Sequence, residues 1–520
     1  MGKNIRLFKK FYFLLIVCCS IIQIIINETI EDYIILGMVI SLNLLILIYC
    51  IDENKFYKYP ISLSVIFFSV FTNSASALFF KTFELEPISS NLLLPLNTFT
   101  LFFFANLVVM GTHKIYEKRN NIITDNFFTN INHKLNLFNI NTKFIFLLGT
   151  FAIFSQLLLK NFFKVDLINL YELGPNLIYR ILSGFDSFYL FPFILILSNK
   201  LFKKEFKINK LTIFLFFLVI VYISIGSNRR DVLFFGILAY FMILFIVYLL
   251  DLIKFNKKNT IFLILFIVIM ATSFQKIITF NKIYIYERNL SDKRSMQENV
   301  KSFYKSLNNT FSGKLDLSIY ENYYQYSIGQ TKIKNYYNSL IYERMNPIRY
   351  ADSILSIYNE LDERDIQKIK QYSINRLFSI MPQPIINIFN KDFEKLNYIY
   401  LSTASFISKL DNPLHFSRND VGSFLVELKM LFGIFFFLPL IFVSYISFKI
   451  FDSFYNNEKK IFSPVIVVLF ISAGSSILDF FASPSLDIMA NTLLREIPQT
   501  ILIFVISYFL YNNLFNPTKN

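Results

Sequence analysis

The sequence has 520 residues, of which 54% are hydrophobic and only 17% are charged, and its formal net charge is +15. One or two soluble domains cannot bury that much apolar surface, so the composition excludes an ordinary soluble protein. It predicts an all-α, polytopic integral membrane protein.

The apolar runs along the chain predict about twelve transmembrane helices, each close to the length that crosses about 30 Å of hydrocarbon. The runs lack the period-two alternation of a lipid-facing barrel, so helices are expected throughout. No small-residue cleavage site follows the first run, which is therefore expected to stay as a membrane helix. The predicted spans are 11–26, 33–51, 60–80, 91–112, 144–160, 179–198, 211–226, 231–253, 260–280, 430–450, 463–482 and 498–513.

These spans divide the chain into three predicted regions. Residues 1–280 form an N-terminal membrane region of nine helices, and residues 430–520 form a C-terminal membrane region of three. Between helices 9 and 10 lies one long polar segment, residues 281–429, which we expect to be a partly helical extracytoplasmic layer. A structureless loop of that length is uncommon, so a functional role is the better expectation.

The basic residues are concentrated in alternate loops. The chain start (residues 1–10), the loop with Lys55 and Lys58, and the segments 200–210 and 456–460 are all rich in lysine, whereas residues 26–32 are acidic. This is the positive-inside pattern, and it predicts that both termini are cytoplasmic. Because the charge follows topology, no nucleic-acid partner is expected.

Neither a disulfide framework nor a metal site is indicated by the cysteines. Cys18, Cys19 and Cys50 lie in predicted spans and have no C-x-x-C spacing. We predict no cofactor and no metal.

One short gap between apolar runs carries unusual charge. The segment ISIGSNRRDVL, residues 223–233, places Arg229 and Arg230 at a helix end on the side where positive charge is disfavoured. They can extend to lipid headgroups, with Asp231 neutralising one of them. Alternatively, two guanidinium groups bind a phosphate or pyrophosphate bidentately, which lysine does not do. The second interpretation predicts a lipid-linked anionic substrate.

Three stretches resemble segments of O-antigen polymerases of the Wzy type and related oligosaccharide repeat-unit polymerases. Gly226–Arg230 resembles a G-S-x-R segment that opens an apolar helix, and SIMPQPIIN, residues 379–387, resembles a proline-containing stretch of the long loop. NDVGSFLVELKMLFGIFFF, residues 419–437, resembles the run that joins that loop to the next helix, with Gly422, Glu427, Phe432 and Gly433 at the matching positions.

The resemblance implies a membrane glycosyltransferase of the bacterial inner membrane. Such enzymes transfer a growing glycan from one undecaprenyl pyrophosphate carrier to another lipid-linked repeat unit at the outer face, and so build O-antigen, capsule or exopolysaccharide. The implied partners are the lipid-linked glycan, membrane lipid and a chain-length regulator protein.

Such a reaction needs cationic groups for the leaving pyrophosphate and an acceptor for the proton of the attacking hydroxyl. Arg229 and Arg230 are the first candidates for the pyrophosphate, with Arg180 on the preceding outer loop as a third. Each arginine of the long loop also fits a solvated surface residue. These loop candidates are Arg344, Arg349, Arg376 and Arg418.

The predicted acid or base residues are Glu427 and Asp420, where the long loop meets the membrane. Glu427 equally fits a carboxylate that is favoured by the dipole at a helix start. Asp479 lies inside an apolar run, where ionisable residues usually face a cavity or a partner.

Two other classes fit the predicted topology. An O-antigen ligase has similar helices and a similar loop, but its loop histidine is followed by a polar residue, whereas His415 is followed by Phe416. A lipid-linked oligosaccharide flippase or another transporter also fits twelve helices, although such folds usually show repeated halves and short outer loops. A polymerase is the interpretation we take forward.

Overall fold

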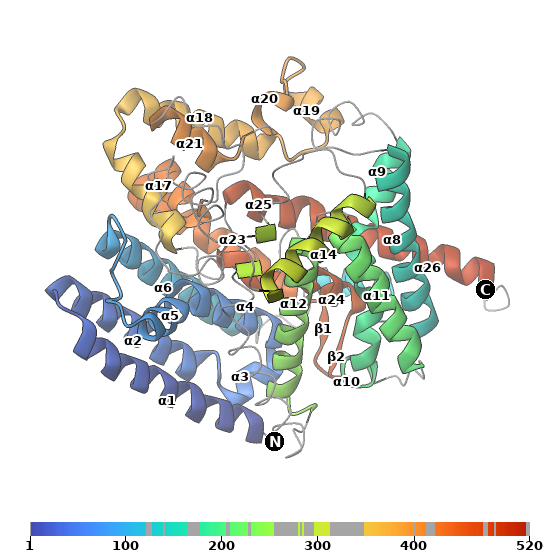
Figure 1. Ribbon diagram of the computed structural model, residues 1–520, viewed down its shortest axis with the longest axis horizontal. Helices are drawn as coiled ribbons and strands as arrows, with labels where there is room; N and C mark the ends of the chain where they lie inside the picture. The colour runs from blue at the N-terminus through green and yellow to red at the C-terminus, as the bar shows by residue number, and fades with distance from the viewer. Residues whose placement is uncertain are drawn as a thin grey trace. The chain divides into compact units, whose positions relative to one another are not determined.

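In the computed structural model, the regular secondary structure of the described residues is helical except for one two-stranded ribbon (Figure 1). The structure describes residues 2–120, 127–138, 141–163, 177–203, 209–226, 230–253, 279–280, 283–284, 296–312, 348–399, 401–411, 422–471, 477–482 and 485–515. The ribbon is β1 (Tyr455–Asn456) with β2 (Ile461–Phe462). The predicted all-α class is confirmed for this part of the chain.

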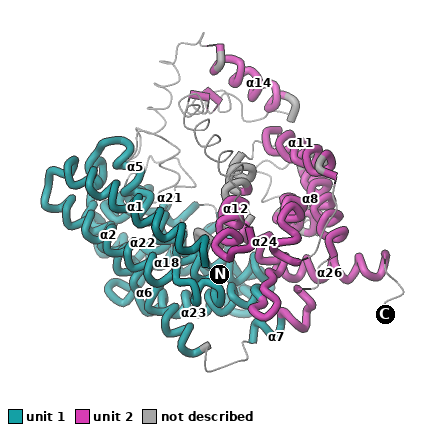
Figure 2. The backbone as a smooth tube through the Cα atoms, turned by 90° about the horizontal axis from the view of Figure 1, so that it is seen from below, with its two compact units in different colours: residues 1–131, 329–455, 477–498 teal, residues 132–328, 456–476, 499–520 magenta. Residues whose placement is uncertain are grey.

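The chain forms two compact units whose residues alternate along the sequence (Figure 2). Unit 1 contains residues 1–131, 329–455 and 477–498, and unit 2 contains residues 132–328, 456–476 and 499–520.

The membrane helices of unit 1 pack α6 against α23 and α2, and α1 against α2 and α5. The 3-10 segment η5 lies along α4. The elements before the long loop are α1 (Lys3–Ile26), α2 (Ile30–Tyr49), α3 (Glu53–Lys58), α4 (Pro60–Val70), η1 (Phe71–Ala75), α5 (Ser76–Glu84), α6 (Pro95–Asn120) and α7 (Phe127–Lys134). Those after it are α22 (Phe424–Phe432), η4 (Gly433–Phe436), α23 (Phe437–Asp452), η5 (Ile477–Ala482), α25 (Leu486–Asn491) and η6 (Thr492–Glu496).

Short helices from the predicted long loop form a layer on unit 1, which we call the amphipathic layer. Its members are α17 (Ile348–Glu360), α18 (Glu363–Phe378), α20 (Leu396–Ile399) and α21 (Thr403–Asp411), with α19 (Gln383–Phe389) beside them. Helix α17 buries Ile348, Ala351 and Leu355, a spacing that puts one apolar stripe on a helix face. α17 packs on α6 and α22, and α18 packs on α22 and α25 (Figure 1).

Unit 2 is built around α8, which packs on α9 and on the 3-10 segments η2 and η3, while α11 packs on α14 and α12. Its elements are α8 (Thr142–Phe163), α9 (Leu177–Gly184), η2 (Asp186–Phe188), η3 (Phe191–Leu197), α10 (Ser198–Phe202), α11 (Lys210–Gly226), α12 (Arg230–Leu249), α14 (Met296–Ser312) and α24 (Pro464–Ile471). Helix α26 (Ile497–Phe515) lies almost entirely in this unit.

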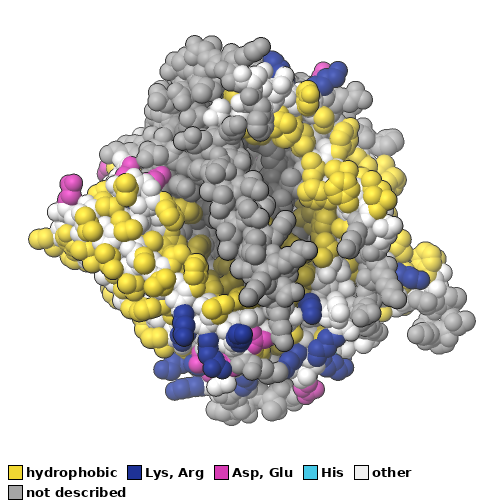
Figure 3. All heavy atoms as spheres, turned by 60° about the horizontal axis from the view of Figure 1, so that its bottom comes forward, with side chains coloured by type: hydrophobic (Ala, Val, Ile, Leu, Met, Phe, Trp, Pro, Cys, Tyr) yellow, Lys and Arg dark blue, Asp and Glu magenta, His cyan; other side chains and the backbone are white. Residues whose placement is uncertain are grey.

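Seven helices of the described residues are long and apolar enough to cross a membrane. They are Lys3–Ile26, Ile30–Tyr49, Pro60–Glu84, Pro95–Arg119, Thr142–Leu159, Phe424–Asp452 and Leu486–Phe515. Each contains or overlaps a predicted span. Large apolar side chains such as Phe11 and Ile25 are more than half exposed, and Figure 3 shows hydrophobic side chains gathered in broad areas of the surface. Exposed apolar area of this extent is typical of a lipid-facing surface.

The remaining five predicted spans differ in how the structure describes them. Spans 211–226 and 231–253 coincide with shorter apolar helices, and span 260–280 lies almost wholly outside the described residues. Span 463–482 is divided into α24 and η5, with residues 472–476 outside the described part. The prediction of one continuous helix over 179–198 is wrong, because α9 ends at Gly184 and 3-10 turns follow. Pro192 explains part of this break, since proline lacks the amide that an α-helix uses.

Two of the predicted basic segments, the chain start and the loop with Lys55 and Lys58, lie with the end of α6 at the same end of unit 1. Arg6 of the chain start forms a 3.7 Å ion pair with Glu53, and Lys55 forms one of 3.3 Å with Glu117 at the end of α6. Helices α6, α22 and α25 begin at the opposite end, where the amphipathic layer packs on them. Loops that share one side of a membrane are expected to meet in this way.

Candidate functional site

Most of the predicted site arginines lie outside the described residues or have no described side chain. Arg229, Arg344 and Arg418 lie outside the described residues, as do Asp420 and His415. Arg180 is placed on α9, and Arg230 is the first residue of α12, but only their backbone is described. Asp479 is likewise placed by its backbone alone, in η5. The pyrophosphate role of residues 226–231 therefore stays a prediction.

Arg349 is one of two arginines of the predicted set whose side chains are described, and Arg376 is the other. Arg349 Nη2 donates a hydrogen bond of 2.8 Å to the hydroxyl of Tyr350, and the Arg349 guanidinium carbon lies 4.4 Å from the centre of that ring. The charge thus lies over an aromatic face, a geometry that favours a cation.

Glu427 lies in the first turn of α22, as the sequence predicts for a helix start after the long loop. Its side chain is buried, with 3% of the residue exposed. One carboxylate oxygen, Oε2, accepts a 2.9 Å hydrogen bond from the backbone amide of Leu486, the first residue of α25. Glu427 therefore connects the starts of two membrane helices.

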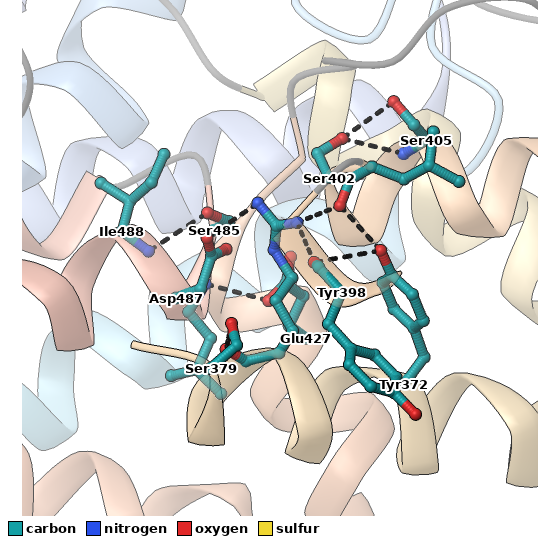
Figure 4. A network of polar contacts seen from close by, with 12 residues as sticks. Tyr372, Ser379, Tyr398, Ser402, Ser405, Glu427, Ser485, Asp487 and Ile488 are labelled. Atoms are coloured by element: carbon teal, nitrogen blue, oxygen red, sulfur yellow. Dashed lines mark hydrogen bonds and ion pairs between the residues drawn. The ribbon is translucent and has the colours of Figure 1, made fainter. Parts of the chain in front are cut away.

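Arg376 of α18 lies at the same place. It forms a 2.9 Å ion pair with Asp487 of α25, and its Nη1 donates to the carbonyl oxygens of Tyr398 (2.8 Å) and Leu401. The hydroxyl of Tyr372, one turn earlier on α18, donates to the Leu401 carbonyl at 2.8 Å. Figure 4 shows Tyr372 of α18, Tyr398 of α20, Glu427 of α22 and Asp487 of α25 close together.

Burial and charge act against each other on the arginine. Burial alone lowers the pKa of Arg376, but the neighbouring Asp487 carboxylate outweighs burial and holds that pKa above its ordinary value. Burial also raises the pKa of Tyr372. At neutral pH the charged guanidinium of Arg376 therefore lies beside the neutral phenol of Tyr372.

We call Arg376, Glu427 and Asp487 the charged cluster. Three buried polar atoms in it have no hydrogen-bond partner among the described residues: Glu427 Oε1, Asp487 Oδ1 and Arg376 Nε. A buried polar atom without a partner costs about 1–3 kcal/mol, and more when it is charged. Other buried charges are better satisfied, because the Asp352 carboxylate accepts three hydrogen bonds and that of Asp452 accepts two from Ser62.

The chemistry open to the charged cluster follows from these atoms. A carboxylate oxygen without a partner can accept a proton from a hydroxyl, and a guanidinium can offset the negative charge that remains. The described residues contain no group of three or more histidine, cysteine, aspartate or glutamate side chains that could hold a metal ion.

Asp487 was not predicted as a site residue. Residues 483–497 lie between two predicted spans, but Ser485 followed by Asp487 is a pattern typical of a helix start. In the structure, the Ser485 hydroxyl accepts a hydrogen bond from the Ile488 amide at 3.4 Å. That pattern marks the start of α25, although it does not reveal the arginine partner.

Comparisons with protein-family models, with curated proteins and with solved structures find no match to this chain.

Proposed function

We propose that this protein is a membrane glycosyltransferase that polymerises lipid-pyrophosphate-linked oligosaccharide repeat units. The observation that supports the proposal most is the charged cluster itself. It lies where helices of the predicted loop pack on the starts of two membrane helices, and it contains Glu427, one of the two acid or base candidates that the sequence predicts.

The proposed reaction is a displacement at the anomeric carbon of the donor glycan. A hydroxyl of the acceptor repeat unit forms the new C–O bond, the bond from that carbon to the carrier pyrophosphate breaks, and the hydroxyl proton moves to a carboxylate oxygen. Glu427 Oε1 and Asp487 Oδ1 are the acceptors we assign, because both lack a partner among the described groups. The pyrophosphate leaves with both bonding electrons, and a role of Arg229 and Arg230 in holding it stays a prediction from the sequence alone.

Arg376 is a positioning residue in this scheme. Its fork is occupied by Asp487 and by two carbonyl oxygens, so it fixes α18 against α25 and keeps a positive charge beside both carboxylates. Lysine retains the charge but cannot make these three contacts in one plane.

The proposed site lies in the inner membrane of a bacterium, with substrate reaching it from the outer leaflet. This location follows from the predicted topology, in which the long loop and the start of α22 face outward. A chain-length regulator and the lipid-linked glycan are the proposed partners.

The test is the polysaccharide ladder of a strain that lacks this gene, complemented at matched membrane abundance. Wild type is expected to restore long chains, whereas Glu427→Gln should leave mostly single repeat units. Arg364→Lys on the exposed face of α18 is the control for Arg376→Lys, and only the second should shorten the ladder.

Two results would redirect the proposal. Full-length polymer in the null strain would exclude a polymerase. Polymer that accumulates on its lipid carrier without reaching its final acceptor would indicate a ligase, and loss of all surface glycan with repeat units retained inside would indicate a flippase.

A further inference from the structure

A second polar cluster lies inside an apolar membrane span, away from the charged cluster. The span Pro60–Glu84 contains the sequence SVFTNSASA, residues 69–77, whose polar side chains fall in its middle. Ser69, Asn73 and Asn106 of the adjacent α6 are each at most 2% exposed. We call these three residues the amide cluster.

The polar atoms of the amide cluster are only partly hydrogen-bonded among the described residues. Ser69 donates its hydroxyl to Asn106 Oδ1 at 3.2 Å, and Asn73 Nδ2 donates to Ser69 Oγ at 3.5 Å. Asn106 Nδ2 donates to the Phe102 carbonyl of its own helix at 2.8 Å. Asn73 Oδ1 has no hydrogen-bond partner among the described residues, although it is buried.

The backbone at the amide cluster is also unusual. Residues Phe71–Ala75 form the π-helical turn η1, in which the Ser76 amide reaches back to Phe71 O. Beside it, the 3-10 segment η5 packs on α4 and on η1. π-helical turns within α-helices often occur at functional sites, and interrupted membrane helices often mark ion sites.

Ordinary interhelical bonding explains part of this arrangement. Asparagine and serine side chains commonly join membrane helices, as the Ser69–Asn106 bond does here. The same is true of Asn43 on α2, which donates to Ser74 Oγ at 2.9 Å and accepts from the Tyr12 hydroxyl at 2.7 Å. Helix joining does not explain Asn73 Oδ1, which is left without a donor where water is scarce.

We propose that the amide cluster and the π-helical turn bind a monovalent alkali cation. The donor atoms are neutral oxygens, namely Asn73 Oδ1, Asn106 Oδ1 and Ser69 Oγ. Neutral amide, hydroxyl and carbonyl oxygens replace the hydration shell of Na⁺ or K⁺ in membrane proteins. Divalent cations are usually held by carboxylates, and the amide cluster has none.

The test uses the purified full-length protein in lipid nanodiscs. Thermal unfolding is followed in NaCl, in KCl and in choline chloride at equal ionic strength. At least one alkali cation should raise the unfolding temperature in a saturable manner relative to choline, because a ligand that binds only the folded state stabilises it. Asn73→Leu should abolish that dependence.

Two further variants keep the test decisive if Asn73→Leu folds poorly. Asn73→Asp adds a negative charge at the same position, and it should lower the half-saturating cation concentration about tenfold. Thr112→Val is the control, since Thr112 is a buried hydroxyl of α6 whose hydrogen-bond partner among the described residues is the Val108 carbonyl of its own helix at 2.8 Å. It should leave the cation dependence unchanged.

The proposal is overturned if the wild type unfolds at the same temperature in all three salts. It is also overturned if Asn73→Asp is destabilised without a gain in cation response, or if Thr112→Val loses the response together with Asn73→Leu. None of these outcomes depends on the proposed glycosyl transfer.

Discussion

Asp352 attaches the amphipathic layer to the start of α6, and its removal gives a sharp test of how the layer is held. The carboxylate is 2% exposed and accepts hydrogen bonds from the amides of Leu93 (2.6 Å) and Leu94 (2.8 Å) and from the hydroxyl of Thr98 (3.1 Å). These donors precede or open a long membrane helix, whose positive dipole end favours a carboxylate.

The magnitude follows from the three bonds. A hydrogen bond to a charged group contributes about 1.5–3 kcal/mol to stability, but the backbone near Leu93 and Leu94 is half-buried, so water recovers part of the loss. We expect Asp352→Ala to lower the free energy of unfolding by about 3–5 kcal/mol. Asp352→Asn keeps one acceptor oxygen and should cost about half as much.

Asp362→Ala is the matched control. Asp362 also accepts from a helix-start amide, that of Asp365 at 2.8 Å, but it is exposed and, within the described part of the chain, is bonded to no other element. Loss of such a cap costs about 1 kcal/mol. The assay is unfolding in mixed micelles, with proteolysis of residues 348–411 as a local readout. Equal losses for Asp352→Ala and Asp362→Ala would refute the claim that Asp352 holds the layer.

Three further results are expected. Replacing Arg376 by Met alone should cost up to about 3–5 kcal/mol because it leaves the half-buried Asp487 without its cation. The double variant with Asp487→Leu should recover much of that stability without recovering polymer on the ladder, and recovery of both would contradict the proposed role. Burial raises the pKa of Tyr455 to about 12, so this tyrosine ionises at lower pH in the unfolded chain, and the free energy of unfolding should fall by about 2–3 kcal/mol between pH 10 and 12. Tyr455→Phe should show a shallower fall across this range, and an unchanged slope would count against the burial of Tyr455 as the cause. Ser62→Ala should cost about 1–3 kcal/mol because the Ser62 hydroxyl donates to Asp452 at 2.6 Å and bonds His113 at 2.9 Å. Ser64→Ala should cost less because Ser64, among the described residues, bonds the carbonyl of Pro60 in its own turn. Equal unfolding midpoints for the two variants would argue against the network of Ser62, Asp452 and His113.

The long apolar helices were predictable because few structures other than a membrane helix satisfy the backbone of such a run. The predicted span begins at residue 430 because Glu427 and Lys429 interrupt the apolar run, whereas α22 begins at Phe424; a carboxylate near the start of that helix was the part that the sequence indicated. These features depend on neighbours in the sequence, and a single chain carries that information.

The contacts of the charged cluster could not be predicted in the same way. Arg376 and Asp487 are far apart in the sequence, and nothing near either residue indicates its partner. The π-helical turn at Phe71–Ala75 has no local signal either, because its residues fit an ordinary helix and the turn is set by packing against α2, α6 and η5. Tertiary packing decides both features.

Glycosyl transfer is tested most directly by polymerisation with the purified protein in lipid vesicles supplied with an undecaprenyl-pyrophosphate-linked repeat unit. We expect products that grow by whole repeat units, with one carrier pyrophosphate released for each new linkage. Glu427→Gln should slow both by at least about 100-fold while Arg364→Lys leaves them unchanged, since acid or base catalysis typically contributes 10²–10⁴-fold. Growth at the wild-type rate in Glu427→Gln would contradict the assigned site, and an absence of growth in the wild type despite substrate binding would contradict the proposed glycosyl transfer.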